Sequence, residues 1–126
     1  MRRALLLLFA AATLSVSAAP RAIPGITAKD AFPQACVSCH IKEHRITTML
    51  ARHPKKHPAV NAKDIPASCM KCHAKASKNA FAPIMHRKHL GADTSEFVVK
   101  FDGECTHCHK LDRKTGLWTI PSAAEK

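Results

Sequence analysis

The sequence predicts a small, mainly α-helical domain with extensive irregular loops and little sheet. The first observation is length, because 126 residues are enough for one small domain. The second is periodicity: apolar residues recur at near-helical spacing in residues 41–53, and no segment indicates an extensive sheet. The third is composition, since a chain with five Phe, one Trp and no Tyr buries little apolar surface of its own. Such a chain usually needs a staple or a cofactor to hold its fold.

The expected secondary structure consists of short elements separated by prolines. A helix is expected over residues 41–53, IKEHRITTMLARH, and Pro54 ends it. A second short helix is expected over residues 74–82, before Pro83. Residues 96–101, EFVVKF, have the character of a brief strand. The C-terminal tail contains a Lys-Thr-Gly turn and otherwise shows no clear structure.

The first 18 residues have the pattern of a secretory signal peptide. Two arginines form a charged start, an apolar run covers residues 4–14, and small residues suit cleavage after Ala18. This run is short for a membrane span, which needs about 20 apolar residues, and an uncleaved N-terminal anchor is the alternative. Cleavage leaves residues 19–126, of which 19–35 form a loose lead-in with three prolines. We therefore expect an exported, periplasmic protein.

The exported chain is strongly basic. Removing the two N-terminal arginines lowers the formal net charge from +11 to +9. A basic chain can indicate nucleic-acid binding, but little nucleic acid is present outside the cytoplasm. An acidic protein partner, or an anionic cofactor that neutralises charge internally, fits export better. Association with a membrane is expected only through a partner or through an uncleaved signal.

All six cysteines belong to three copies of one short motif, C-x-x-C-H, which is the attachment signature of a c-type haem. Two thiols three residues apart can reach the two vinyl groups of one haem edge, and the next residue then offers its imidazole to the iron. The expected thioether positions are Cys36, Cys39, Cys69, Cys72, Cys105 and Cys108, and the expected proximal ligands are His40, His73 and His109. We therefore expect three haem c groups in one trihaem domain over residues 36–126, with a core formed largely by the haems.

Two other uses of the cysteines are open. Zinc can bind cysteine together with histidine, but it does not explain a histidine directly after the second cysteine of every copy. Six cysteines in an exported chain can also form three disulfides. The small ring closed by C-x-x-C is usually redox-active rather than structural, and a disulfide framework leaves nine histidines without a purpose.

A further segment, HRKH at residues 86–89, precedes the third motif. Together with the three motifs it resembles the small soluble multihaem cytochromes c, namely the class III cytochromes, their three-haem c7 relatives and the small tetrahaem cytochromes. The resemblance covers roughly residues 36–109 and is carried by the motifs, not by the stretches between them. In c7-type proteins an H-x-x-H pair donates sixth ligands to two different haems, which implies that His86 and His89 are distal ligands. In those relatives the pair precedes the first motif, whereas here it precedes the third.

Three distal histidines are enough to give every iron two histidine ligands. The position of His57 ahead of CMKCH resembles a common distal arrangement in multihaem chains, so His57 joins His86 and His89 as an expected distal ligand. His53 and His44 are the reserve candidates. For each of them, a surface histidine in a basic loop is the alternative. His107 is held between two tethered cysteines and is expected to be solvated or to lie at a haem edge.

An iron with two histidine ligands leaves no position for a substrate. The sequence therefore predicts an electron carrier, of low potential, and not an enzyme. Its expected partners are redox proteins with an acidic docking surface. One alternative is a small haem enzyme in which a five-coordinate iron acts on nitrite or peroxide. Another is the haem subunit of a multi-subunit electron conduit.

Overall fold

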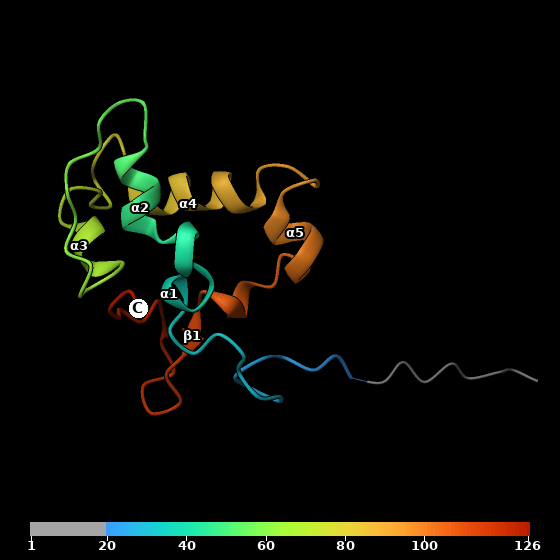
Figure 1. Cartoon of the computed structure of the whole chain (residues 1–126). Helices are drawn as coiled ribbons and strands as arrows, with labels where there is room; N and C mark the ends of the chain where they lie inside the picture. The colour runs from blue at the N-terminus through green and yellow to red at the C-terminus, as the bar shows by residue number, and fades with distance from the viewer. Residues whose placement is uncertain (1–19) are drawn as a thin grey trace, which may run out of the picture.

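The structure, a computed structural model, describes residues 20–126 (Figure 1). The predicted signal peptide and its cleavage site lie outside these residues. Its helical elements are α1 (Cys36–Cys39), η1 (Lys42–His44), α2 (Ile46–Ala51), α3 (Ala67–Met70), α4 (Phe81–Leu90), α5 (Glu96–Phe101) and η2 (Cys105–His107). The strands β1 (Lys110–Leu111) and β2 (Trp118–Thr119) form one antiparallel pair. The prediction of a mainly helical chain with little sheet is confirmed.

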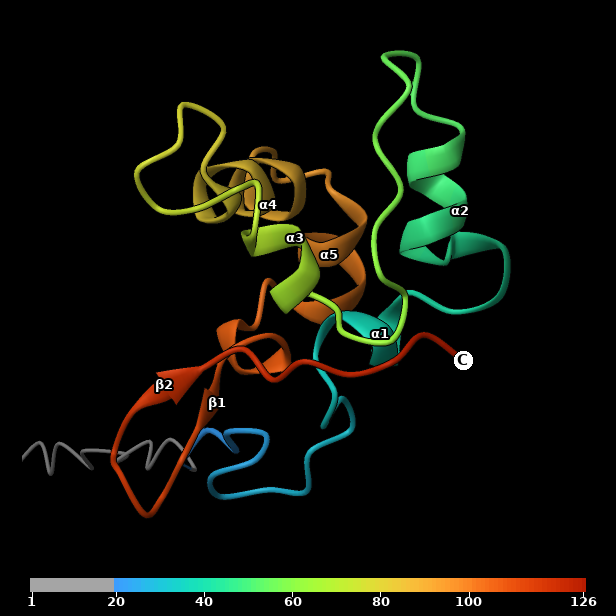
Figure 2. The ribbon, with the colours of Figure 1, turned by 90° about the vertical axis from the view of Figure 1, so that its left-hand side faces the viewer.

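The elements divide between two halves of the molecule (Figure 2). Helices α2, α3 and α4 and the loops between them lie in the upper part of this view, with α5 at the height of α3, and the β1–β2 hairpin and the N-terminal segment lie in the lower part. The C-terminal tail connects the halves because it runs back along the segment before α3. Ile65 and Ala123 exchange two backbone hydrogen bonds of 3.0 and 2.9 Å, and Thr47 donates its hydroxyl to Glu125.

Two of the predicted elements are wrong. Residues 74–80 form turns instead of a helix, because the Ser77 hydroxyl accepts the Asn79 N–H and so offers the backbone a local alternative to helical hydrogen bonds. The helix begins only at Phe81 and contains Pro83 in its first turn, where a missing N–H costs nothing. The predicted strand over residues 96–101 is helix α5, whose first turn is capped by the Ser95 hydroxyl.

The other predicted elements are found in shortened form. The helix expected over residues 41–53 is divided into η1 and α2, which ends at Ala51. The Lys-Thr-Gly turn lies in the hairpin loop, where Gly116 has a φ of 71° that favours glycine. The carboxylate of Asp112 accepts the Lys114 N–H at 2.8 Å and so begins this turn.

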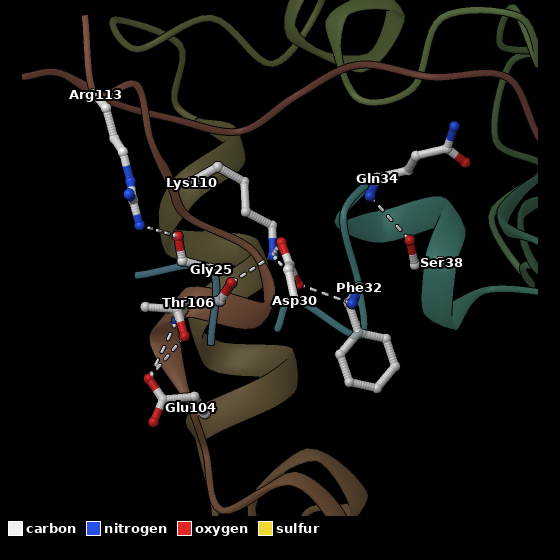
Figure 3. A network of polar contacts seen from close by, with 9 residues as sticks. All are labelled: Gly25, Asp30, Phe32, Gln34, Ser38, Glu104, Thr106, Lys110 and Arg113. Atoms are coloured by element: carbon white, nitrogen blue, oxygen red, sulfur yellow. Dashed lines mark hydrogen bonds and ion pairs between the residues drawn. The ribbon is translucent and has the colours of Figure 1, made fainter. Parts of the chain in front are cut away.

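The lead-in is held against the third motif by polar contacts (Figure 3). Lys110 forms an ion pair of 2.9 Å with Asp30, whose carboxylate also accepts the Phe32 N–H. Arg113 donates to the carbonyl of Ile26 at 2.6 Å. These contacts place residues 25–32 beside the start of the hairpin.

The protein interior is small. Within residues 20–126, the buried side chains are Ala35, Val37, Ile65, Pro66, Cys69 and Thr106. Large apolar side chains such as Val99, Leu117 and Trp118 are more than half exposed. A chain with so little apolar burial depends on additional apolar surface for a stable fold. No helix in the described part of the chain is long and apolar enough to cross a membrane.

Candidate functional site

The three C-x-x-C-H motifs adopt the same local turn. In each copy the backbone N–H of the histidine donates to the carbonyl of the first cysteine, at 2.9 Å for His40, 3.0 Å for His73 and 2.9 Å for His109. This is a helical i to i+4 bond, and in a helical turn residues three apart lie on one face. The two thiols of each motif therefore share a face, and the histidine follows at a fixed orientation. The repeat in the sequence is a repeat in backbone structure.

The cysteines are all thiols. All six lie within the described residues and none of them forms a disulfide. Burial raises the pKa of Cys36 to about 11, and the neighbouring Cys108, Cys69 and Cys39 thiols contribute to this shift. The first motif thus lies next to the third motif and near the second.

Each motif histidine faces one of the three histidines predicted as distal ligands. The ring centroids of His40 and His89 are 6.1 Å apart. Those of His57 and His73 are 5.9 Å apart, and those of His86 and His109 are 6.1 Å apart. We call these the first, second and third histidine pairs, after the motif to which each belongs.

This spacing suits two imidazoles that share one metal ion. A bond from metal to imidazole nitrogen is about 2.0–2.1 Å, and the ring centre lies roughly 1 Å further out, so opposite imidazoles have centres about 6 Å apart. All three pairs meet this distance. Their ring planes differ in relative angle, which is 88° in the first pair, 12° in the second and 48° in the third.

Backbone carbonyls orient four of the six rings. The Nδ1 atoms of His40, His57, His73 and His89 lie 3.1, 2.7, 2.6 and 2.9 Å from the carbonyls of His44, Pro58, Asn79 and Met85. A carbonyl only accepts, so Nδ1 carries the proton in each case. Nε2 is then the free, unprotonated nitrogen, and metal-binding histidines usually have this arrangement.

His40 is also in the charge state that binds a metal. Burial lowers the pKa of its imidazole, and the nearby His89 lowers it further. The contact with the His44 carbonyl raises the pKa but does not outweigh these effects. The ring is therefore neutral at pH 7, with a lone pair on Nε2.

Helix α4 links two of the pairs. His86 and His89 are three residues apart on it, so their side chains lie one turn from each other. His89 faces the first motif and His86 faces the third, and Phe97 of α5 packs edge-on against the His89 ring at 5.5 Å. His57 comes instead from the loop between α2 and α3 and faces the second motif.

The remaining histidines lie elsewhere. His44 is exposed and lies 3.6 Å from Glu43, and the exposed His53 accepts the Lys55 N–H on its Nδ1. Among the described residues, neither reserve candidate faces a motif histidine.

His107 is not solvated as a whole: it packs against Phe32 at 4.6 Å, and its buried Nδ1 has no hydrogen-bond partner in the described structure. Its place in this aromatic cluster gave no signal in the sequence.

The arrangement fits haem in its donor set and in its surroundings. In the part of the chain that the structure describes, no three His, Cys, Asp or Glu side chains are grouped to hold one metal ion. A haem iron needs only two protein ligands, because the porphyrin supplies the others. His109 lies at the edge of a cavity of about 240 Å³ that Trp118, Leu111 and Ile26 also line. Exposed apolar side chains beside the motifs, such as Met70 and Ile41, offer contact surface to an apolar macrocycle.

Comparison with known proteins gives no relative: no protein-family model, no curated protein and no solved structure matches the chain.

Proposed function

We propose that this chain is a periplasmic electron-transfer protein with three covalently bound haem c groups, of the small soluble multihaem cytochrome c type. The observation that carries the proposal is the pairing of each C-x-x-C-H histidine with one other histidine at about 6 Å. A haem held between two histidines supplies one-electron exchange between ferric and ferrous iron.

The chain's own residues have separate roles in this proposal. The six cysteines tether the three groups, two to each group, so that none is lost from a fold with little interior. The paired histidines would hold the irons through Nε2, and the carbonyl contacts of His57 and His73 keep their rings from turning. Because each iron would take one histidine of this chain from either side, the protein ligands would not need to change with the oxidation state, and reorganisation would be small.

The distal ligands come from two places in the chain. Helix α4 serves the first and third pairs and so holds these two centres close together. The loop histidine His57 serves the second pair. The thiols of Cys108 and Cys69 lie near enough to Cys36 to raise its pKa, so the three motifs are close together and three groups tethered to them would be neighbours.

The pairing does not favour an enzyme. A catalytic iron for nitrite or peroxide needs an open axial position, and therefore a motif histidine without a facing histidine. Each of the three motif histidines has a facing histidine. We therefore propose a carrier that serves redox partner proteins. No observation favours the multi-subunit conduit.

Intact-mass measurement on the exported protein tests the proposal. Three covalent haem c groups and loss of residues 1–18 are expected, and in-gel haem staining should persist after denaturation because the groups are tethered. A mass equal to that of the unmodified polypeptide would overturn the proposal. A Cys69→Ala/Cys72→Ala variant should carry two groups instead of three.

A further inference from the structure

The positive charge of the protein is confined to one part of the chain. Residues 45–92, here called the basic segment, contain ten Lys and Arg and a single carboxylate, Asp64. The described residues on either side, 20–44 and 93–126, contain eight Lys and Arg and eight Asp and Glu. The whole net charge of +9 in residues 20–126 therefore comes from the basic segment.

The ion pairs follow the same division. The Lys and Arg that form ion pairs in the described structure are Arg21, Lys100 and Lys110, and their partners are Glu104, Glu96 and Asp30. All six of these residues lie outside the basic segment. All ten cations of the basic segment are exposed, and none forms an ion pair with another described residue. The described residues outside the basic segment carry equal numbers of positive and negative charges, whereas the basic segment carries exposed positive charge without ion-pair partners among the described residues.

The basic segment is also contiguous in space. It comprises α2, α3, α4 and their connecting loops, which lie in the upper part of the molecule in Figure 2, where α5 is the neighbouring helix from outside the segment. The one carboxylate that reaches this half from the C-terminal tail is Glu125, which is bound to Thr47. Haem propionates, two per group, contribute at most six negative charges and do not cancel an excess of nine.

The second histidine pair lies within the basic segment. Both of its members, His57 and His73, belong to residues 45–92, whereas the first and third pairs each take a motif histidine from outside. Lys55, Lys56, Lys71 and Lys75 all lie within two residues of this pair along the chain and are exposed. A surface with this much unpaired positive charge attracts an acidic partner and orients it during encounter.

We infer that an acidic redox protein docks on the basic segment and exchanges electrons with the haem held by His57 and His73. This inference rests on the proposed function and adds the site of exchange. In each exchange, the partner's reduced group loses one electron and the iron at the second pair gains it. The hairpin and the lead-in, which lie outside the basic segment, are away from this contact.

Stopped-flow reduction of the oxidised holoprotein by an acidic flavodoxin tests the inference. The first variant replaces Lys55, Lys56, Lys71 and Lys75 by Gln. The matched control replaces Lys29, Lys42, Lys114 and Lys126 by Gln, which are exposed cations outside the basic segment and form no ion pair with another described residue. Each variant loses four positive charges, so the two differ only in where the charge is lost.

The wild-type rate constant should fall with salt. At low salt the rate constant of the first variant should be about tenfold or more below that of the wild type, and the rate constant of the control should be less than about threefold below it. Reduction by a photogenerated neutral flavin semiquinone should be the same in all three proteins, because no charge steers it. Equal losses in the two variants, or a wild-type rate independent of salt, would overturn the inference.

Two further measurements distinguish failure of the docking inference from failure of the proposed function, and a protein partner from a lipid surface. Haem content and a low-spin spectrum are checked first, so a protein without haem refutes the proposed function and not the choice of docking surface. Vesicles of phosphatidylglycerol that bind the holoprotein more tightly than flavodoxin does would assign the basic segment to a lipid surface and overturn the inference.

Discussion

In four of the six paired histidines, a hydrogen bond from Nδ1 to a backbone carbonyl determines which ring nitrogen is free to bind a metal. The carbonyls of Pro58 and Asn79 hold protons on the Nδ1 atoms of His57 and His73, so Nε2 of each ring is left as a ligand. His53, four residues before His57, has the opposite arrangement, because its Nδ1 accepts the Lys55 N–H. Two histidines of the same basic loop are thus suited to different uses.

Replacing His57 by Ala should convert one of the three haems from low-spin to high-spin, because the second pair loses its distal ligand. The change can be measured in the optical and paramagnetic resonance spectra of the oxidised protein. His53→Ala is the matched control and should leave all three haems low-spin. A high-spin fraction in the His53 variant alone would exchange the roles of the two residues.

The ion pair between Asp30 and Lys110 connects the lead-in to the third motif at a largely buried position, where the two side chains are 19% and 16% exposed. Burial raises the pKa of Asp30, but the hydrogen bond from Lys110 and the Phe32 N–H outweigh it, so the net pKa is lowered. A lowered carboxyl pKa stabilises the fold above the unfolded pKa of about 3.9 and loses this effect as pH falls through the folded value.

Asp30→Asn should therefore lower the free energy of unfolding at pH 7 by about 1.5–3 kcal/mol, the contribution of a hydrogen bond to a charged group. Denaturant titration of the holoprotein at pH 7 and near pH 3 measures this, and the difference from wild type should shrink at the lower pH. Asp93→Asn, at an exposed carboxylate, should change stability by less than about 0.5 kcal/mol at either pH. A difference that grows in acid would contradict the assignment.

At the scale of elements, Ser95 joins the helix that carries two distal histidines to the next helix. Its hydroxyl donates to the His89 carbonyl at the end of α4 and accepts the Val98 N–H in the first turn of α5. Phe97 and Phe101 of α5 then pack with Phe32 and His107. The cap thus fixes α5, which covers the His89 ring.

Ser95→Ala should lower the stability of the holoprotein by about 1–2 kcal/mol, because it removes both hydrogen bonds at once. The neighbouring Thr94→Ala is the control and should cost less than about 0.5 kcal/mol, since Thr94 is exposed and caps no described helix. Thermal unfolding followed by far-ultraviolet circular dichroism compares the two. Equal effects would show that the cap of α5 contributes nothing.

The same elements show how far the sequence predicts this fold. Val98, Val99 and the two phenylalanines of EFVVKF favoured a strand, yet Ser95 as a cap and the Glu96–Lys100 pair, 2.7 Å apart, were local signals of a helix. A proline after residues 74–82 indicates the end of a helix, but a proline in the first turn of a helix, where Pro83 lies, is equally favourable. Residue composition misled where cap positions would have decided correctly.

At the scale of the whole molecule, the motifs could be found in the sequence but their spatial relations could not. The spacing of cysteine and histidine depends on one turn of chain, so it is local information. Which distal histidine meets which motif depends on the paths of α4 and of the loop before α3, and these result from long-range contacts such as Ile65 with Ala123. The uneven distribution of charge can be counted in the sequence. Only the structure shows that the ten cations of the basic segment form no ion pair with another described residue.

The three pairs differ in ring angle, and this difference should be visible in the oxidised protein. Parallel imidazoles act on one iron d orbital and separate it in energy from its partner, whereas perpendicular imidazoles act on both and keep them close. The first pair, at 88°, should give a low-spin signal with large g anisotropy, and the second, at 12°, a rhombic low-spin signal. The third, at 48°, should lie between them.

Electron paramagnetic resonance of the fully oxidised wild-type protein is the most direct test of the account. The expected spectrum contains three low-spin ferric centres, with one signal of large g anisotropy, one rhombic signal and no high-spin component. A high-spin signal accounting for about one iron in three would show that one histidine pair does not hold iron from both sides, and absence of any ferric haem signal would refute the three sites together.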